Sequence, residues 1–403
     1  MWYSDARFAH SNPLHADIFP ACARMEREVV AMTASMLGGG ARGATSVCGC
    51  VTSGGTESIL TALRTTRDFM RSTRGIWDAE IVVAESAHAA VYKAASYFNL
   101  RLVRVPVDKL TLQMDVLATR RAVTRNTVLI YASAPGFPHG VVDDVQALAE
   151  VAQSAGCGLH VDACLGGFVL PFAKKAGWRH GVGLGRPFDF SVAGVTSMSV
   201  DTHKYGLAQK GSSVLLYANP ELRRAQYTAV TEWSGGLYIS PSAAGSRPGG
   251  LIAQTWASLV HMGESGFVAA AQRVLEAADT LAAGVRTIPG LQVLGQHTMV
   301  VAFRSQEPGV NIFQVNDELT SRGWHLNALQ RPAALHFCVT PANSDAVPAL
   351  LRELRAAVDA VRAAKGKAAP GGMAPVYGLA GGLPDRGAVG DLLKGVQDIM
   401  LDG

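Results

Sequence analysis

The chain has 403 residues, 48% of them hydrophobic and 17% charged, which is typical of a folded globular protein with a sizeable core. Its formal net charge is only +4, and no Lys/Arg run forms a basic stripe, which argues against a nucleic-acid partner. The N-terminus lacks a signal pattern and no stretch approaches 18 apolar residues, so we expect no transmembrane helix and a location in the cytoplasm. The six cysteines lack zinc-site spacing, and we expect buried thiols and no metal site.

The first part of the chain predicts an arm followed by alternating strands and helices. Residues 1–45 contain one helix, roughly 20–37, which ends before three glycines. Short apolar runs then predict strands at 46–51, 81–84, 101–105, 128–133, 158–162, 190–197 and 213–217, with helices at 56–71, 87–98 and 142–154 between them. This alternation is typical of an α/β domain with a mainly parallel sheet, here of seven strands.

The second part of the chain predicts a smaller domain. A stretch rich in Gly, Pro and Ser at 235–250 marks a boundary, and a long helix follows at about 251–285. Strands at 291–294, 299–303 and 335–339, a linker at 363–372 and a last helix near 389–400 complete the pattern. We therefore predict an N-terminal arm at 1–45, a large domain at 46–250 and a smaller α+β domain at 251–403.

A glycine-rich turn stands between the first predicted strand and its helix. Gly54 and Gly55 lie in the sequence Thr-Ser-Gly-Gly-Thr-Glu-Ser, flanked by the hydroxyls of Ser53 and Thr56. Backbone amides of such a turn, at a helix N-terminus, bind phosphate well. The alternative is a tight turn in which Thr56 caps the helix. The motif is neither a P-loop nor a dinucleotide fingerprint.

Three more polar groups follow predicted strands. Asp162 ends an apolar strand and is either a cap for the next turn or a carboxylate with a cationic partner, such as a protonated pyridine nitrogen. Lys204 follows His203 after another strand, and a lysine in apolar surroundings has a lowered pKa and becomes a nucleophile, whereas most lysines are solvated surface residues. His88 is either structural or a flat ring stacked on a flat cofactor.

The combination is more specific than its parts. In chain order it comprises a phosphate cradle, a stacking histidine, an aspartate for a ring nitrogen and a lysine for an aldehyde. This constellation resembles that of the fold-type I enzymes that use pyridoxal 5′-phosphate (PLP).

Longer motifs make the resemblance narrower. The chain resembles the sphingosine-1-phosphate lyase family, of the soluble bacterial type, within the PLP-dependent group II decarboxylase-like enzymes. The resemblance is carried by the stretches 12–20, 48–59, 160–167, 201–213, 244–250, 336–340 and 376–380. It implies a homodimer with a shared active site and a phosphorylated lipid substrate. That substrate is cleaved between C2 and C3 by a retro-aldol reaction to a long-chain aldehyde and phosphoethanolamine.

The resemblance also implies site residues. It assigns catalysis to Lys204, which holds PLP as a Schiff base, with His88 and His203. It assigns cofactor binding to Gly54, Gly55, Thr56, His88, Asp162, His203, Lys204 and Ser246. Of these, His88 stacks on the ring, Asp162 bonds its nitrogen, and Ser246 reaches the partner subunit's cofactor phosphate. It assigns the substrate's phosphate to Asn12, His15 and Lys210.

Two departures and two alternatives remain open. The family has a tyrosine upstream of the Asn-Pro-Leu-His segment, and Tyr3 does not match its position well. Proline is common in the family where Gln209 stands. The first alternative is an amino-acid decarboxylase of the same fold, which needs no second phosphate site. The second is a non-catalytic binding module of this fold.

Overall fold

The computed structural model describes residues 7–40, 46–178, 186–364 and 386–402. The chain forms two compact units: Met1–Glu276 with Gly295–Met299, and Ala277–Leu294 with Val300–Gly403. The helix α8 (Gly249–Arg286) belongs to both, and the predicted boundary at 250 falls at its start. The helix α2 (Pro20–Met36) matches the predicted helix of the arm and is part of the first unit.

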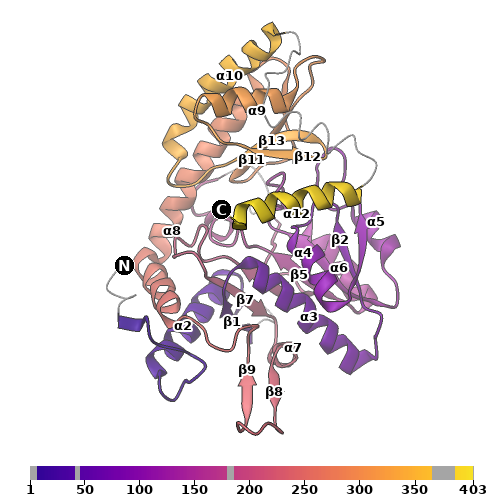
Figure 1. The fold of residues 1–403 in the computed structure, drawn as a ribbon, viewed down its shortest axis with the longest axis vertical. Coiled ribbons are helices and arrows are strands. Elements are labelled where there is room, and N and C mark those ends of the chain that lie inside the picture. Colours follow the sequence, from indigo (N-terminus) through magenta and orange to yellow (C-terminus); the bar gives the residue numbers. More distant parts are fainter. Residues whose placement is uncertain (1–6, 41–45, 179–185, 365–385, 403) are drawn as a thin grey trace. The chain divides into compact units, whose positions relative to one another are not determined.

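The first unit is built on a seven-stranded sheet, as predicted (Figure 1). Its strand order is β1-β7-β6-β5-β4-β2-β3, and only β7 runs antiparallel to its neighbours. The carboxyl ends of β1, β2, β4, β5 and β6 therefore lie along one edge. The strands are β1 (Cys48–Thr52), β2 (Glu80–Ala84), β3 (Arg101–Val105), β4 (Thr127–Ser133), β5 (Gly158–Asp162), β6 (Val195–Val200) and β7 (Ser213–Tyr217).

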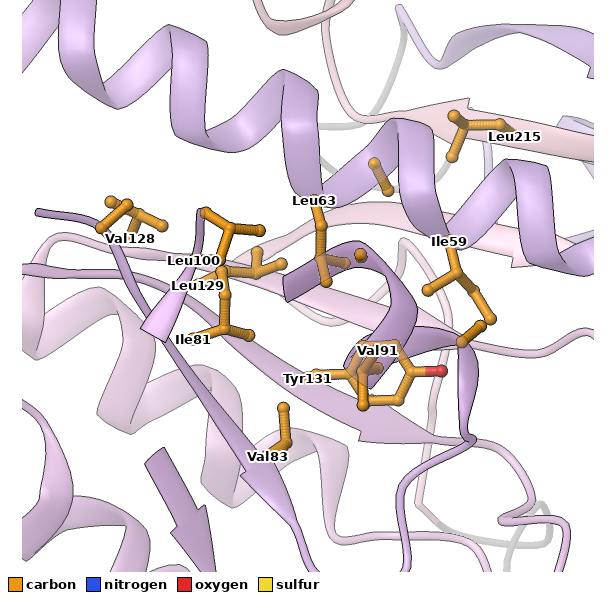
Figure 2. Close-up of a cluster of buried hydrophobic side chains, with 14 of the residues drawn as sticks. Ile59, Leu63, Ile81, Val83, Val91, Leu100, Val128, Leu129, Tyr131 and Leu215 are labelled. Carbon is orange, nitrogen blue, oxygen red and sulfur yellow. The ribbon is translucent and has the colours of Figure 1, made fainter. Parts of the chain in front are cut away.

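Apolar side chains pack between this sheet and helices α3 (Gly55–Arg74) and α4 (Ala90–Phe98). Ile59 and Leu63 of α3 belong to one buried cluster with Ile81, Val83 and Leu129 of the sheet (Figure 2). Every residue of β2, β4, β5 and β7 is buried, which explains why these strands are near-continuous apolar runs. This packing fixes α3, and with it the glycine turn at its start. Helices α5 (Val116–Ala122) and α6 (Val145–Ala155) precede β4 and β5.

Two strand predictions were inaccurate. The strand predicted at 190–197 is β6, which begins only at Val195, after Gly194 with φ of 105°. Its later residues, Ser197 to Val200, include small polar side chains that do not read as a strand but are buried. Within the predicted boundary loop, β9 (Tyr238–Ser240) pairs with β8 (Thr228–Val230) in a two-stranded hairpin (Figure 1).

The second unit contains an antiparallel sheet of order β10-β11-β13-β12 with helices, which confirms the predicted α+β character. Strand β12 was not predicted, because its sequence Asn-Ala-Leu-Gln has no strong strand signal. The elements are β10 (Leu291–Val293), β11 (Val300–Ser305), β12 (Asn327–Gln330), β13 (Ala333–Cys338), α9 (Ile312–Ser321), α10 (Val347–Ala363) and α12 (Arg386–Asp402).

Some predictions fall outside the described residues or remain untested. Tyr3, the stretch 376–380 and most of the linker at 363–372 lie outside them. Among the helices that the structure describes, none combines the length and the apolar character needed to cross a membrane. The location in the cytoplasm stays a prediction.

Candidate active site

A cavity of about 310 Å³ opens at the edge where the parallel strands end. Its volume is at the lower end of the range for small-molecule sites. Residues after β1, β2, β4, β5 and β6 contribute to it, as expected for an open α/β sheet. The lining comprises Ser53, Gly54, Gly55, Thr56, Glu57, Ile59, His88, Pro135, Phe137, Asp162, Cys164, Leu165, Asp201, His203 and Lys204. The predicted cofactor residues are thus brought together, with the exception of Ser246.

The glycine turn lies directly against the side chains of Asp201 and Cys164. A Cβ on Gly55 would lie 2.8 Å from both carboxylate oxygens of Asp201 and from Sγ of Cys164. Gly54, with φ of 154°, is the N-cap of α3, so Thr56 lies inside the helix and the alternative role of Thr56 as a cap is wrong. The Glu57 carboxylate accepts hydrogen bonds from the Ser53 amide at 2.7 Å and the Ala243 amide at 3.1 Å. Residues 54–57 at the N-terminus of α3 therefore line the cavity, with the Glu57 carboxylate bonded to backbone amides.

Asp162 is held as an anion in the cavity wall. Its Oδ2 accepts a hydrogen bond from the Tyr131 hydroxyl, and its Oδ1 accepts from the Cys164 amide at 3.0 Å and the Ser199 hydroxyl at 3.3 Å. Burial opposes ionisation, but the bonds from Tyr131 and Cys164 outweigh it and lower the pKa of Asp162. A fixed, buried carboxylate is the group that a protonated ring nitrogen requires.

His160, on the same strand as Asp162, is a buried polar residue whose role the sequence reasoning missed. His160 is hydrogen-bonded to Ser197 through Nδ1 at 2.8 Å and to Ser199 through Nε2 at 3.1 Å. Its ring stacks on Tyr131 with centroids 5.4 Å apart. Burial lowers the pKa of His160 to about 4, so the imidazole is neutral. Alternation along β5 was the available signal, because residues two apart on a strand share a face.

Lys204 is paired with a carboxylate. Its Nζ lies 2.9 Å from Oδ2 of Asp201, an aspartate three residues earlier that was not singled out from the sequence. Burial would lower the pKa of Lys204, as the sequence reasoning expected, but the charge of Asp201 outweighs burial and raises it. The other oxygen, Oδ1 of Asp201, is buried and has no hydrogen-bond partner among the described residues.

Both predicted catalytic histidines are already engaged through Nδ1. His88 Nδ1 accepts from the Ala90 amide at 3.1 Å, and its ring stands edge-on to Phe137. His203 Nδ1 accepts from the Ser212 amide at 3.2 Å, and its Nε2 lies 3.5 Å from Asp201. Burial lowers the pKa of His203 despite the nearby Asp201. In this arrangement each neutral ring carries its proton on Nε2.

The lining residues fit PLP. Residues 54–56 line the cavity at the start of α3, and backbone amides at a helix N-terminus suit a phosphate. Asp162 is anionic and suits the ring nitrogen, and Lys204 supplies the only lysine amine among the lining residues. Oδ1 of Asp201, which has no hydrogen-bond partner among the described residues, is an acceptor in the same wall.

The predicted residues outside the cavity form a second group. Asn12 donates from Nδ2 to the Ser246 hydroxyl at 3.1 Å and accepts from the Arg247 amide at 3.1 Å. Lys210 is exposed and donates to the His203 carbonyl at 3.4 Å, and His15 is exposed on the arm. None of Asn12, His15, Ser246 and Lys210 is among the described residues that line the cavity.

Comparisons with known proteins agree with this geometry. Residues 6–306 match the pyridoxal-dependent decarboxylase conserved domain. The chain is 52% identical to the sphingosine-1-phosphate lyase of Arabidopsis thaliana, over 97% of this chain and 71% of the relative. It belongs to the sphingosine-1-phosphate lyase family. The rat enzyme, sphingosine-1-phosphate lyase 1, is 44% identical over 96% of this chain and 66% of its own.

Solved structures of a lyase and of a decarboxylase share the fold of this chain. A sphingosine-1-phosphate lyase of Burkholderia pseudomallei matches with a TM-score of 0.86 and 41% identity, over 90% of this chain and 83% of that one. A glutamate decarboxylase of Lactobacillus brevis matches with a TM-score of 0.75 at 16% identity, over 91% of this chain and 86% of that one, and so shows the fold alone. The predicted fold class and pyridoxal dependence are confirmed.

Proposed function

We propose that this chain is a PLP-dependent lyase that cleaves the C2–C3 bond of sphingosine 1-phosphate or a related phosphorylated sphingoid base. The products are a long-chain aldehyde and phosphoethanolamine. The observation that carries the proposal is a single cavity lined by both Lys204 and Asp162, in a chain 52% identical to a sphingosine-1-phosphate lyase.

When bound, PLP supplies an aldehyde that condenses with amines and a pyridinium ring that accepts the electrons of a breaking bond. Lys204 would hold the aldehyde, and the amides of Gly55 and Thr56 would hold the phosphate. Asp162, kept anionic by Tyr131 and Cys164, would hold the proton on the ring nitrogen. His88 would contribute a flat ring to the cavity wall.

A base must accept the proton of the substrate's 3-hydroxyl before the C2–C3 bond breaks. His88 and His203 each have Nδ1 occupied by a backbone amide, which leaves neither ring a free acceptor. Asp201 raises the pKa of Lys204, so this amine binds a proton firmly once it is released from the cofactor. We therefore assign the proton transfer to Lys204.

The second phosphate, on the substrate, needs cations that the cavity lacks. Its lining carries the carboxylates Glu57, Asp162 and Asp201 against the lysine Lys204. The exposed Lys210 and His15, with Asn12, are the residues that we propose for it. Because these and Ser246 lie outside their own chain's cavity, we propose that two copies form a dimer in which each completes the other's site.

Subunit mixing tests the shared site. Lys204→Ala should inactivate the site of the chain that carries it. Ser246→Asp should inactivate the site of the partner chain, because the added carboxylate repels the cofactor phosphate bound there. Each variant alone should be inactive. After unfolding and refolding together, mixed dimers should contain one intact site and regain activity. If mixing restores no activity although mixed dimers form, the shared site is wrong.

The decisive measurement is product release from sphingosine 1-phosphate. Purified protein saturated with PLP should release phosphoethanolamine, and a matched assay with amino acids should release no carbon dioxide. The reverse result would favour the decarboxylase alternative. A protein that gives no visible absorbance change with added PLP would favour the non-catalytic binding module.

A further inference from the structure

A buried ion pair outside the cavity connects the arm with the two segments proposed to bind phosphate. Glu26 lies in the middle of α2 and Arg247 follows Ser246, and their side chains form a salt bridge in which only 13% and 10% of each remains exposed. A pair this buried is costly unless its geometry is maintained by further bonds. The additional partners of both groups therefore show what the pair holds in place.

Those partners are on the strand that leads into the glycine turn. Oε1 of Glu26 accepts a hydrogen bond from the Val51 amide at 3.0 Å, and Nη1 of Arg247 donates to the Val51 carbonyl at 3.4 Å. Val51 lies in β1, an edge strand of the sheet that pairs with β7 on one side. The two side chains thus replace a missing neighbouring strand at the residue that precedes Thr52, Ser53 and Gly54.

The other side of the pair holds Ser246. The Arg247 amide donates to Oδ1 of Asn12 at 3.1 Å, and Nδ2 of Asn12 donates to the Ser246 hydroxyl at 3.1 Å. The backbone at Arg247 is therefore held by two contacts: its side chain bonds Glu26, and its amide bonds Asn12. Among the described residues, Glu26 is the carboxylate that this guanidinium bonds, and the buried Nε of Arg247 has no hydrogen-bond partner.

We infer that Glu26 and Arg247 are positioning residues that hold the glycine turn and Ser246 in a fixed relation. The inference rests on the proposed function, in which the turn binds this chain's cofactor phosphate and Ser246 binds that of the partner subunit. One ion pair would then set the phosphate contacts of both sites in the dimer. Neither residue touches the cavity, so their effect must pass through the backbone of residues 51–54 and 246–247.

The test compares two ligands, PLP and pyridoxal, which differ by the phosphate. Glu26→Gln keeps the side-chain shape and removes the charge. It should weaken PLP binding about tenfold, the effect of losing one charge-assisted hydrogen bond, and leave pyridoxal binding unchanged. Both dissociation constants come from the visible absorbance on titrating cofactor-free protein. Arg24→Gln is the matched control, because Arg24 lies on the same helix, is 74% exposed and, among the described residues, pairs with Glu28 one turn along that helix.

A double variant separates positioning from stability. Glu26→Leu with Arg247→Met replaces the buried pair by apolar side chains of similar size, which is often neutral for folding. It also removes the partners of the Val51 amide and carbonyl, so its urea midpoint should fall. The folded variant should bind PLP about tenfold more weakly and pyridoxal as tightly as the native protein. A folded double variant with native PLP affinity would overturn the inference, as would an equal loss for PLP and pyridoxal. Native protein that binds neither ligand would instead overturn the proposed function.

Discussion

The cavity and the segments proposed to complete it are organised differently. Gly55, His88, Asp162 and Lys204 are far apart in sequence, but each lies at or after the end of a strand of one sheet, and the parallel strand ends bring them together. Asn12, His15 and Ser246 lie on an arm and a loop that no strand end directs to the cavity. We propose that the sheet of one chain builds the cofactor site, whereas binding of the substrate's phosphate depends on segments that a second copy would bring.

The largest effect should come from Lys204→Ala, in the group built by the sheet. The variant should lose the absorbance of the lysine-bound cofactor, and turnover of sphingosine 1-phosphate should fall by about a thousandfold or more, because amine and proton carrier are lost together. Lys175→Ala, at an exposed ion pair with Glu264, is the control. Turnover that survives in the Lys204 variant would refute the central assignment.

Asp162→Asn should reduce kcat about a hundredfold, because a neutral amide no longer stabilises the charge of the ring nitrogen. Tyr131→Phe removes one hydrogen bond to the same carboxylate and should cost about tenfold. Single-turnover rates on both variants give the comparison. Equal effects of the two changes would mean that the charge of Asp162 is not what matters.

The buried His160 should make the free energy of unfolding of the protein depend on pH. Its folded pKa of about 4 lies below its ordinary value, so its contribution is present above pH 6.5 and is lost as pH falls towards 4, on the order of 3 kcal/mol. In His160→Gln this loss should be absent from urea-unfolding free energies measured between pH 7 and pH 4. The same slope in both proteins would contradict the buried, neutral imidazole.

Asp143 provides the control for that slope. Burial raises its pKa to about 6, so its contribution is present at low pH and is lost as pH rises through 6. Because this runs opposite to His160, Asp143→Asn should make the loss of stability on acidification steeper than in the native protein.

The smallest effect should come from the second group. Lys210→Gln should raise KM for sphingosine 1-phosphate about tenfold and leave kcat nearly unchanged, since it removes a charge remote from the reacting bond. Lys109→Gln, on an exposed loop, is the matched control. An unchanged KM for the Lys210 variant would remove the argument for a substrate phosphate at this position.

The sequence predicted the elements whose signals are local. Strands β3, β5 and β7 matched the predicted bounds at 101–105, 158–162 and 213–217, because each is a short run that contains Leu and Val and has clear ends. The prediction for β6 was wrong at both ends, because the apolar residues from Phe190 suggested an early start and the hydroxyl residues up to Ser199 suggested an early end. In the structure, Thr196, Ser197 and Ser199 belong to the strand. Their side chains are instead partners of the strand residues Leu159, His160 and Asp162 on neighbouring β5, which is a tertiary relation.

The same limit applies to the site. Lys204, Asp162 and the glycines could be singled out, because each stands at a strand end within a distinctive motif. Tyr131 could not, since it lies within an apolar strand and its role depends on a hydroxyl reaching Asp162 across the sheet. The raised pKa of Lys204 was likewise not foreseeable from burial, because it depends on where Asp201 points.

The one reversed strand has a consequence for how Lys204 is held. Because β7 runs opposite to β6, the segment from Asp201 to Ser212 leaves and re-enters the sheet at the same edge. Hydrogen bonds join the two ends of this segment. The His203 amide donates to the Ser212 carbonyl at 3.3 Å, and the Thr202 hydroxyl donates to the Ser212 hydroxyl at 2.8 Å. The entropic cost of ordering this loop is therefore met when the sheet forms. Ligand binding does not have to order the loop again.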